Sequence, residues 1–385
     1  MKIKDICTSV TDGSHNPPQG IEKSEYMMLS SKNIFDDEIT FDEPRFLSEK
    51  DFEREHKRTQ IAVGDVLLTI VGTVGRTAVV DEDMPAFALQ RSVAVLHPKN
   101  DVCLPRFLMY ALRGKRTYIE NRAKGVAQKG IYLKEVSDID IYIPDISNQE
   151  IIINKLDKVN TIIKLRQEEL LALDNLIKAR FVEMFGDPVA NDKGWKMKPL
   201  LDMGKCKNGM NFHYDDSGVE ISCLGVGDFK DLSVIDNTKK LSIVSLNEMP
   251  SEEYLLKDGD IVFVRSNGNK DLVGRSLAIY PGKLPTTFSG FCIRYRIHDD
   301  EITVPYLLRV LKMESMRKKM AGRGANIQNL NQQILGTLVI PVPPIELQNQ
   351  FVDFVRAIDK SKVAVQKALD ETQILFDSLM QKYFG

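Results

Sequence analysis

The sequence predicts an α+β fold in which two similar mixed α/β domains are separated by two long antiparallel helices, with an internal pseudo-two-fold relation. Two observations predict it. The chain of 385 residues is an approximate tandem duplication, and each copy ends in a helical segment without glycine or proline. We therefore expect globular domains at 1–146 and 191–344, and helical spacers at 147–190 and 345–385.

The duplication is visible as identical residues at a constant separation of 199 positions. The pairs are Gly75 and Gly274, Gly125 and Gly324, Pro144 and Pro343, Gln149 and Gln348, and Phe185-Gly186 and Phe384-Gly385. Small insertions shift other matches, so that Gly64-Asp65 recurs as Gly259-Asp260. Both copies are therefore expected to share one fold.

Each copy begins with short apolar runs and glycine turns. The runs 65–71 and 260–264 are typical of buried strands. Helices are expected near 105–123 and 305–321, each followed by a polar loop that contains glycine. A closing strand then ends at Pro144 in the first copy and at Pro343 in the second.

The two long helices carry an apolar seam. Alternating spacings of four and three residues are typical of a coiled coil, and both copies carry them at matching positions. The seam residues are Ile152, Leu156, Val159, Ile163, Leu170 and Ile177, and Phe351, Val355, Ile358, Val365, Leu369 and Phe376. We therefore expect the helices to pack on each other. The alternative, in which each helix packs only on its own domain, is disfavoured because the seam outruns the surface of a small domain.

Three basic residues, Arg166, Arg180 and Lys362, interrupt this seam. We expect their charged ends to reach water at its edge. The alternative is that they fix the register of the helices or meet a partner.

Composition narrows the function classes. The hydrophobic share of 43% and the charged share of 28% are ordinary for a globular protein. No run of 18 apolar residues and no signal-like N-terminus is present, so a membrane or secretory role is not expected. The five scattered cysteines form no C-x-x-C pair, which argues against disulfides and a zinc site and for the reduced cytoplasm.

Basic residues gather at the same place in both copies, although the net charge of the chain is −2. Residues 106–134 hold eight basic side chains against one acid, and residues 305–333 hold six against one. A charged helix face is usually only a solvated face, but its recurrence favours contact with DNA phosphates. Two unlike copies on a shared frame predict two unlike half-sites, separated by unread bases.

Reading bases requires hydrogen-bond donors and acceptors on loops, chiefly the side chains of Arg, Lys, Asn and Gln. The candidates in the first copy are Arg76, Gln90, Arg91, Arg116, Arg122, Lys124, Gln128 and Lys129. The candidates in the second copy are Arg265, Asn267, Asn269, Lys270, Arg275, Arg317, Lys318, Arg323, Asn326 and Gln328. The segment Thr11 to His15 is a further candidate. For any one of these residues, a surface turn without DNA contact is the competing interpretation.

Taken in order, several short motifs resemble those of type I restriction–modification specificity subunits over nearly the whole chain. They are Thr11-Asp12-Gly13-Ser14-His15, Gly64-Asp65-Val66-Leu67, Gly125 to Ile131, the strand–proline–glutamine junctions at Ile143-Pro144…Gln149 and Val342-Pro343-Pro344…Gln348, and Phe185-Gly186-Asp187-Pro188. One departure is Asp145-Ile146-Ser147, which stands where the family has a second proline. It leaves the start of the first long helix open.

The resemblance implies two target-recognition domains, an antiparallel coiled-coil spacer and no catalytic residue in this chain. It also implies assembly on double-stranded DNA with two methyltransferase subunits and, for cleavage, two restriction subunits. Those partners would carry S-adenosylmethionine, ATP and magnesium, and this chain would hold no metal.

Two other functions compete with DNA reading. A methyltransferase is disfavoured because Gln19 replaces the aromatic residue in Asn16-Pro17-Pro18-Gln19, and no glycine-rich cofactor fingerprint is present. A coiled-coil adaptor without DNA contact would explain the helices. It would not explain the duplicated basic segments.

Overall fold

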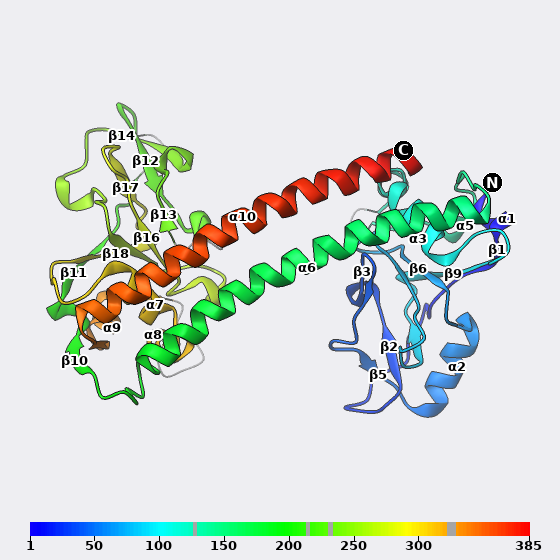
Figure 1. Ribbon diagram of the computed structural model, residues 1–385, viewed down its shortest axis with the longest axis horizontal. Coiled ribbons are helices and arrows are strands. Elements are labelled where there is room, and N and C mark those ends of the chain that lie inside the picture. Colours follow the sequence, from blue (N-terminus) through cyan, green and yellow to red (C-terminus); the bar gives the residue numbers. More distant parts are fainter. Residues whose placement is uncertain (126–128, 213–215, 230–233, 322–328) are drawn as a thin grey trace. The chain divides into compact units, whose positions relative to one another are not determined.

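The computed structural model describes residues 1–125, 129–212, 216–229, 234–321 and 329–385. The chain divides into two compact units (Figure 1). Unit 1 contains Met1–Glu169 and Val365–Gly385, and unit 2 contains Leu170–Ala364. Each unit therefore combines one globular head with parts of both long helices. We call residues 1–145 head 1 and residues 186–344 head 2.

Head 1 is built on an antiparallel sheet with the strand order β1-β9-β6-β7. Its strands are β1 (Cys7–Asp12), β9 (Val93–Pro98), β6 (Val66–Thr69) and β7 (Thr77–Val79). Beside it lie a sheet of β5 (Arg45–Phe46), β2 (Met27–Leu29) and β8 (Phe87–Leu89), and a hairpin of β3 (Ile34–Phe35) and β4 (Glu38–Ile39). The helical elements are α1 (Ile3–Ile6), η1 (Ser31–Asn33), α2 (Glu49–Thr59), α3 (Pro105–Gly114), α4 (Arg116–Arg122) and α5 (Leu133–Ser137).

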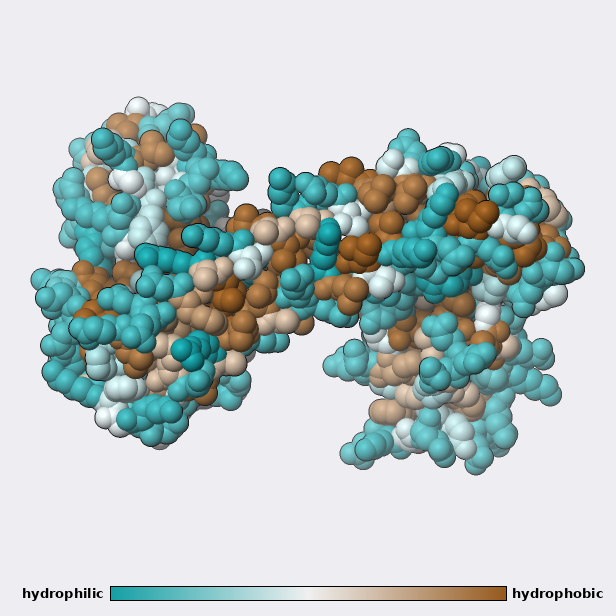
Figure 2. Space-filling model, viewed as in Figure 1, coloured by the Kyte–Doolittle hydropathy of each residue, from teal (hydrophilic) through white to brown (hydrophobic). Residues whose placement is uncertain are grey.

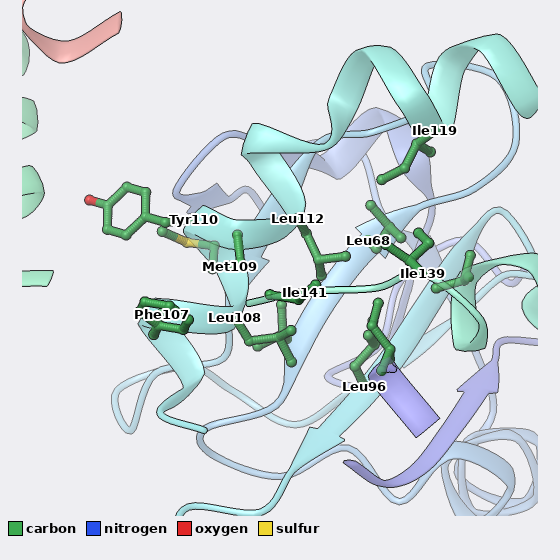
Figure 3. Packing of buried hydrophobic residues seen from close by; sticks show 14 of the residues in the cluster. Leu68, Leu96, Phe107, Leu108, Met109, Tyr110, Leu112, Ile119, Ile139 and Ile141 are labelled. Carbon is green, nitrogen blue, oxygen red and sulfur yellow. The ribbon is translucent and has the colours of Figure 1, made fainter. Parts of the chain in front are cut away.

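Every residue of β6 is buried, because both faces of this strand are covered. Leu68 points into the cluster with Leu108, Leu112 and Ile139 (Figure 3), whereas Leu67 belongs to the cluster on the other face. The continuous apolar run of this segment thus has the predicted origin, a central strand.

Head 2 repeats this plan with the strand order β11-β18-β15-β16-β13. These strands are β11 (Gly204–Asn208), β18 (Cys292–Ile297), β15 (Asp260–Val264), β16 (Ser276–Ile279) and β13 (Val234–Ile235). The other strands are β14 (Ser242–Leu246), β12 (Val219–Leu224) and β17 (Thr286–Phe288), and the pair β10 (Lys196–Pro199) and β19 (Val339–Val342). The helical elements are α7 (Val304–Lys312), α8 (Glu314–Ala321), α9 (Gln332–Gly336), η2 (Leu200–Asp202), η3 (Val226–Asp228), η4 (Thr238–Lys240), η5 (Glu252–Tyr254) and η6 (Lys270–Leu272).

Strand register confirms the duplication residue by residue. Val66 faces Leu96 in head 1, and Ile261 faces Tyr295 in head 2. The turn after this strand is repeated too, because Gly75 has φ +93° and Gly274 has φ +75°. A left-handed backbone of this kind favours glycine, which is why this residue recurs in the sequence.

The long helices are α6 (Ile146–Phe185) and α10 (Ile345–Phe384), and each contains 40 residues. In unit 1, Lys155 lies 3.5 Å from the Tyr383 hydroxyl, and Arg166 donates to the Ala368 carbonyl and the Thr372 hydroxyl. In unit 2, Phe181 packs on Phe351 with ring centroids 5.4 Å apart. Within each unit the residue numbers rise along one helix as they fall along the other, so the predicted antiparallel pairing is confirmed (Figure 1).

All twelve predicted seam residues are buried or half-buried. The basic residues that interrupt the seam make more specific contacts than the exposure to water at the seam edge that we expected. Lys362 forms a 2.7 Å ion pair with Asp174 across the helices, and Arg166 bonds to α10 as described above. These two residues fix the register, whereas Arg180 pairs along its own helix with Glu183 at 2.8 Å.

The end of each long helix packs on the first helix of a head. In unit 1, Phe384 of α10 contacts Phe107 of α3, with ring centroids 5.3 Å apart. In unit 2, Phe185 of α6 contacts Tyr306 of α7 at 4.8 Å. The recurring Phe-Gly pair of the sequence is therefore a helix end that anchors on a head.

A buried glutamine joins the start of each long helix to its head. The Gln149 side-chain amide donates to the carbonyls of Val102 and Pro144, and its oxygen accepts from the Leu104 N–H. Gln348 makes the matching bonds to Glu301, Pro343 and Thr303.

The departure from the family pattern at Asp145 is also accounted for. Asp145 accepts a 2.9 Å bond from the Asn148 N–H and stands immediately before the first residue of α6. The bonds from Asn148 lower the pKa of the Asp145 carboxyl. An acid before a first helical turn stabilises that turn, so it replaces the proline as a start signal.

Candidate nucleic-acid interface

Four loops of head 1, far apart in the sequence, meet at one cleft of about 310 Å³. Its lining comes from the segment 11–15, the loop after β6, the β8–β9 turn and the segment that follows α4. The lining residues are Asp12, His15, Ile70, Val71, Arg91, Lys124, Gly130, Ile131, Tyr132 and Leu133. The sequence indicated these loops separately, and the fold brings them together.

Backbone bonds hold these loops against one another. Lys124 and Gly130 exchange N–H to carbonyl bonds of 2.8 and 2.9 Å, which closes the glycine loop. The Ile131 N–H donates to the Ile70 carbonyl at 2.9 Å, and the Gly72 N–H donates to the Lys129 carbonyl at 3.0 Å. The backbone groups of the lining loops are therefore hydrogen-bonded to one another, which fixes the positions of the side chains that line the cleft.

Gly13 allows the closest approach within this cluster. A Cβ atom at Gly13 would lie 2.1 Å from the Leu89 carbonyl oxygen, and one at Gly209 would lie 2.1 Å from that of Ser289. No side chain fits at such a distance, so glycine is required in both heads. The Thr11-to-His15 motif thereby brings its loop against the β8–β9 turn.

Three cations of the cleft region are exposed, namely Arg91, Lys124 and Lys129. None of their side chains has a hydrogen-bond or ion-pair partner among the residues that the structure describes. The acid beside them is already paired, because Asp12 lies 3.2 Å from Arg58 and 2.8 Å from His15. The cleft thus offers positive charge to a ligand.

Other predicted cations are used inside head 1. Arg116 donates to the Gly75 carbonyl at 3.1 Å and to the Asp36 carboxylate. Arg76 lies 4.8 Å from the centre of the Phe35 ring. Both side chains are half-buried, so the structure gives them a positioning role in the turn after β6. That these two side chains also contact DNA stays a prediction.

The basic segment 106–134 therefore has two faces. Arg106 forms ion pairs with Asp37 at 3.0 Å and Asp157 at 2.8 Å, and it fastens α3 to α6. Arg122 instead is exposed and lies 4.6 Å from the Tyr118 ring centre. The sequence showed the excess of positive charge but not the acids that neutralise part of it.

Head 2 has the same loop cluster with different side chains. The Arg265 N–H donates to the Phe291 carbonyl at 2.8 Å, and the Leu330 N–H donates to the Arg265 carbonyl at 2.7 Å. The Asn267 side-chain oxygen accepts from the Asn269 N–H at 2.7 Å. The Asn269 side-chain oxygen likewise accepts from the Asp271 N–H at 3.0 Å, so both asparagines shape their own loop.

The remaining predicted residues of head 2 separate into two groups. Arg275 and Arg317 both donate to the Asp271 carbonyl, at 3.3 and 3.2 Å. Burial, followed by the nearby Arg275, lowers the pKa of Arg317. Lys318 is exposed and pairs with Glu314 one helical turn away at 2.6 Å.

Some predicted residues lie outside the described part of the chain. They are Gln128, Arg323, Asn326 and Gln328, and the side chain of Lys270. Two exposed aromatic side chains, by contrast, escaped the sequence prediction. Tyr132 lines the cleft of head 1 and is 72% exposed, and Phe291 is 60% exposed on the β17–β18 turn of head 2. A search restricted to Arg, Lys, Asn and Gln could not find them.

Within the described ranges, no group of His, Cys, Asp and Glu side chains is arranged to hold a metal ion. The same residues contain no helix that is both long and apolar enough to cross a membrane.

Comparison with known proteins gives one consistent result. A family model described as the type I restriction modification DNA specificity domain matches residues 1–175 and 192–372. The chain is similar to the type I restriction enzyme EcoBI specificity subunit of Escherichia coli, at 26% identity over 47% of this chain and 38% of that protein. It is similar to the StySPI specificity subunit of Salmonella potsdam, at 26% identity over 64% and 57%. These matches span about two fifths and somewhat more than half of those relatives.

Solved structures agree on the fold. The S subunit of a type I restriction-modification system from M. genitalium matches with a TM-score of 0.55 and 15% identity, over 100% of this chain and 95% of that one. A chain from a study of complex assembly and conformational transition of the type I R-M system matches with a TM-score of 0.59 and 17% identity, over the same shares.

Proposed function

Because this chain belongs to the family of the type I restriction modification DNA specificity domain, we propose that it is the sequence-specific DNA-binding subunit of a type I restriction–modification complex. Each head reads one half of a bipartite, asymmetric site on double-stranded DNA. The paired helices α6 and α10 set the number of unread base pairs between the halves. The chain itself catalyses no reaction.

The observation that carries this proposal is the duplicated loop cluster. The same backbone bonds recur in both heads, whereas the exposed side chains on that frame differ. Contacts to phosphates position a protein on DNA, and side chains in the grooves distinguish bases. A constant frame with variable side chains is what two readers of unlike half-sites require.

Charge in head 1 supports phosphate contact. Arg91 and Lys124 line the cleft, and Lys129 directly precedes its lining residue Gly130. All three side chains are exposed and have no partner in the described chain. A nucleic acid that neutralises them releases condensed counterions, so its affinity falls steeply with salt. A protein partner with an acidic surface is the competing ligand for these cations. Its binding would also weaken with salt, so only a titration with DNA separates the two ligands.

The surface of α6 supports docking of further subunits. Besides its buried seam, the part of α6 that belongs to unit 1 exposes Ile151, Ile162 and Leu165, whose spacings of 11 and 3 residues return to one side of a helix. Apolar surface is visible along the long helices (Figure 2). Exposed stripes of this kind mark interaction sites.

We assign that stripe to methyltransferase subunits, two per chain, with two restriction subunits joining for cleavage. The S-adenosylmethionine, ATP and magnesium would reside on those partners. A cytoplasmic location follows from the DNA that such a complex would read.

The test is DNA binding by the full chain in complex with its methyltransferase subunits, titrated at several salt concentrations. We expect the triple variant R91A/K124A/K129A to bind all sequences more weakly. Its plot of log affinity against log salt should flatten, by up to about 0.9 units per lost phosphate contact. A matched control neutralises Lys23, Lys32 and Lys50, three exposed lysines of head 1 that do not line the cleft.

Each rival function has its own outcome. If neither the chain nor its complex binds DNA, the protein is an adaptor. If the isolated chain transfers methyl groups to DNA, it is a methyltransferase in its own right. If the salt slope of the triple variant equals that of the wild type, the cleft is not part of the DNA interface.

A further inference from the structure

The turns between β8 and β9 in head 1 and between β17 and β18 in head 2 share one backbone. In head 1, Gln90, Arg91 and Val93 donate through their N–H groups to the carbonyls of Leu29, Ser14 and Gln90. In head 2, Ser289, Gly290 and Cys292 donate to the carbonyls of Leu224, Met210 and Ser289. All of these bonds are between 2.6 and 3.1 Å long. The turns therefore present their side chains from equivalent positions.

The third residue of each turn completes the match. The Ser92 carbonyl accepts from the N–H groups of Ile70 and Val71, and the Phe291 carbonyl accepts from those of Arg265 and Ser266. In head 1 this turn lines the basic cleft through Arg91. The turn of head 2 consequently belongs to the corresponding surface.

The exposed chemistry of the two turns is opposite. Head 1 presents the guanidinium of Arg91, while the Ser92 hydroxyl accepts a 3.0 Å bond from the Ser31 N–H. Head 2 has Gly290 in place of the arginine and presents the Phe291 ring, which is 60% exposed. Cys292, the next residue, is fully buried. A fully bonded backbone thus presents a large apolar ring to water at the turn whose counterpart in head 1 lines the cleft.

On the premise of the proposed function, we infer that Phe291 is a specificity-determining residue that contacts the C5-methyl group of a thymine in the half-site read by head 2. The major groove offers one apolar feature, this methyl group, and phenylalanine is among the side chains that contact it. The Arg265 guanidinium lies beside this turn, because it donates to the Gly290 carbonyl at 3.4 Å. Donors beside an apolar ring fit a base edge, where the methyl group lies next to hydrogen-bonding groups.

The same frame in head 1 predicts no contact with a thymine methyl group there, because Arg91 and Ser92 stand where head 2 has Gly290 and Phe291. The two half-sites would then differ at the positions that these turns reach.

The test uses the full chain with its methyltransferase subunits. The recognised site is first determined by selection from random duplexes. Each thymine of the head 2 half-site is then replaced in turn by deoxyuridine, which removes only the methyl group. For the wild type, one replacement should weaken binding by about three- to tenfold. The variant F291A should bind the intact site more weakly by a similar factor and should not respond to that replacement.

Two further variants control this experiment. F291L keeps an apolar contact and should retain part of the response to the methyl group. I243A removes a side chain that is 65% exposed on β14 of the same head, away from the turn, and should keep the wild-type pattern. Melting temperatures establish that each variant is folded.

The outcomes separate the two proposals. If the wild type selects no sequence, the proposed function fails and the inference fails with it. If it selects a site in which every thymine tolerates deoxyuridine, or if F291A remains as sensitive as the wild type, only the inference is overturned. Insertion of the ring between bases would give this second result.

Discussion

At the scale of single residues, the recurring sequence motifs are mainly structural. Gln149 and Gln348 are completely buried, and each satisfies backbone groups of the loop before α3 or α7 and of the closing proline. Their recurrence therefore reflects how a head is fastened to a long helix. It is independent of any ligand that the heads bind.

This role predicts a measurable loss of stability. Substituting Gln149 or Gln348 by methionine preserves the volume but leaves three backbone partners unsatisfied. Each substitution should cost about 2–4 kcal/mol of unfolding free energy. Thermal or denaturant unfolding of the full chain measures the loss, and Q350M, at an exposed position of α10, is the control. A loss equal to that of the control would show that the bonds contribute nothing.

A second residue pair makes the heads differ in their response to pH. Asp65 lies 2.7 Å from His97 in head 1, and at the matching place in head 2 Asp260 lies 2.7 Å from Arg296. The hydrogen bond that His97 donates to the Asp65 carboxylate raises the pKa of His97 above its ordinary value of 6.5. Arg296 stays charged throughout the physiological range.

The sign of the effect follows from linkage. Protonated His97 stabilises head 1 below pH 6.5, and this contribution is lost as the pH rises through the raised pKa. The melting temperature of H97Q should therefore lie furthest below that of the wild type near pH 6, and the difference should shrink toward pH 9. H298Q, which removes an exposed histidine of head 2, is the control. A difference that grows with pH would contradict the assignment.

At the scale of elements, α6 and α10 behave as one paired rod within each unit. Apolar packing along the seam is non-directional, so polar contacts between the helices are needed to set their register. Arg166 and Lys362 provide them through the Ala368 carbonyl, the Thr372 hydroxyl and Asp174. Each helix is about 60 Å long at ~1.5 Å per residue.

This pairing makes helix length a functional variable. Deleting one heptad from one of the two helices removes about 10 Å of its length. It also moves Arg166 or Lys362 away from the contacts on the other helix that set the register. We expect such a variant to lose its recognition site or to recognise one with a shorter unread gap. Sequencing of methylated bases in cells that carry the variant reports the site. Methylation of the original site at full strength would refute the role of the helices as a spacer.

At the scale of the whole molecule, two copies of one fold have diverged in their loops. The loop Arg265 to Lys270 has no close counterpart in the first copy. Exchanging it for the corresponding loop of another specificity subunit should alter one half-site and leave the other unchanged. Selection from random duplexes checks this result. Changes in both half-sites would mean that the heads do not read independently.

The sequence by itself determined the duplication, the two long helices, their seam and the glycine turns. Each depends on local periodicity or on the backbone conformation of one residue, and both are visible in a short stretch of sequence. The positions of Gly75, Gln149 and Phe185 could be matched to their copies for the same reason. The junction at Asp145 could not, because a capping carboxylate and a proline begin a helix by different means.

Only the tertiary structure decided which of the predicted side chains are available to a ligand. Arg116 is neutralised by Asp36, which lies 80 residues away in the sequence, and no local pattern announces such a pair. Four separate loops converge on one cleft, and Phe291 faces water on a turn whose neighbours are buried. Exposure and charge pairing depend on long-range packing, so a reading of residue types counts the cations of an interface without knowing which of them are free.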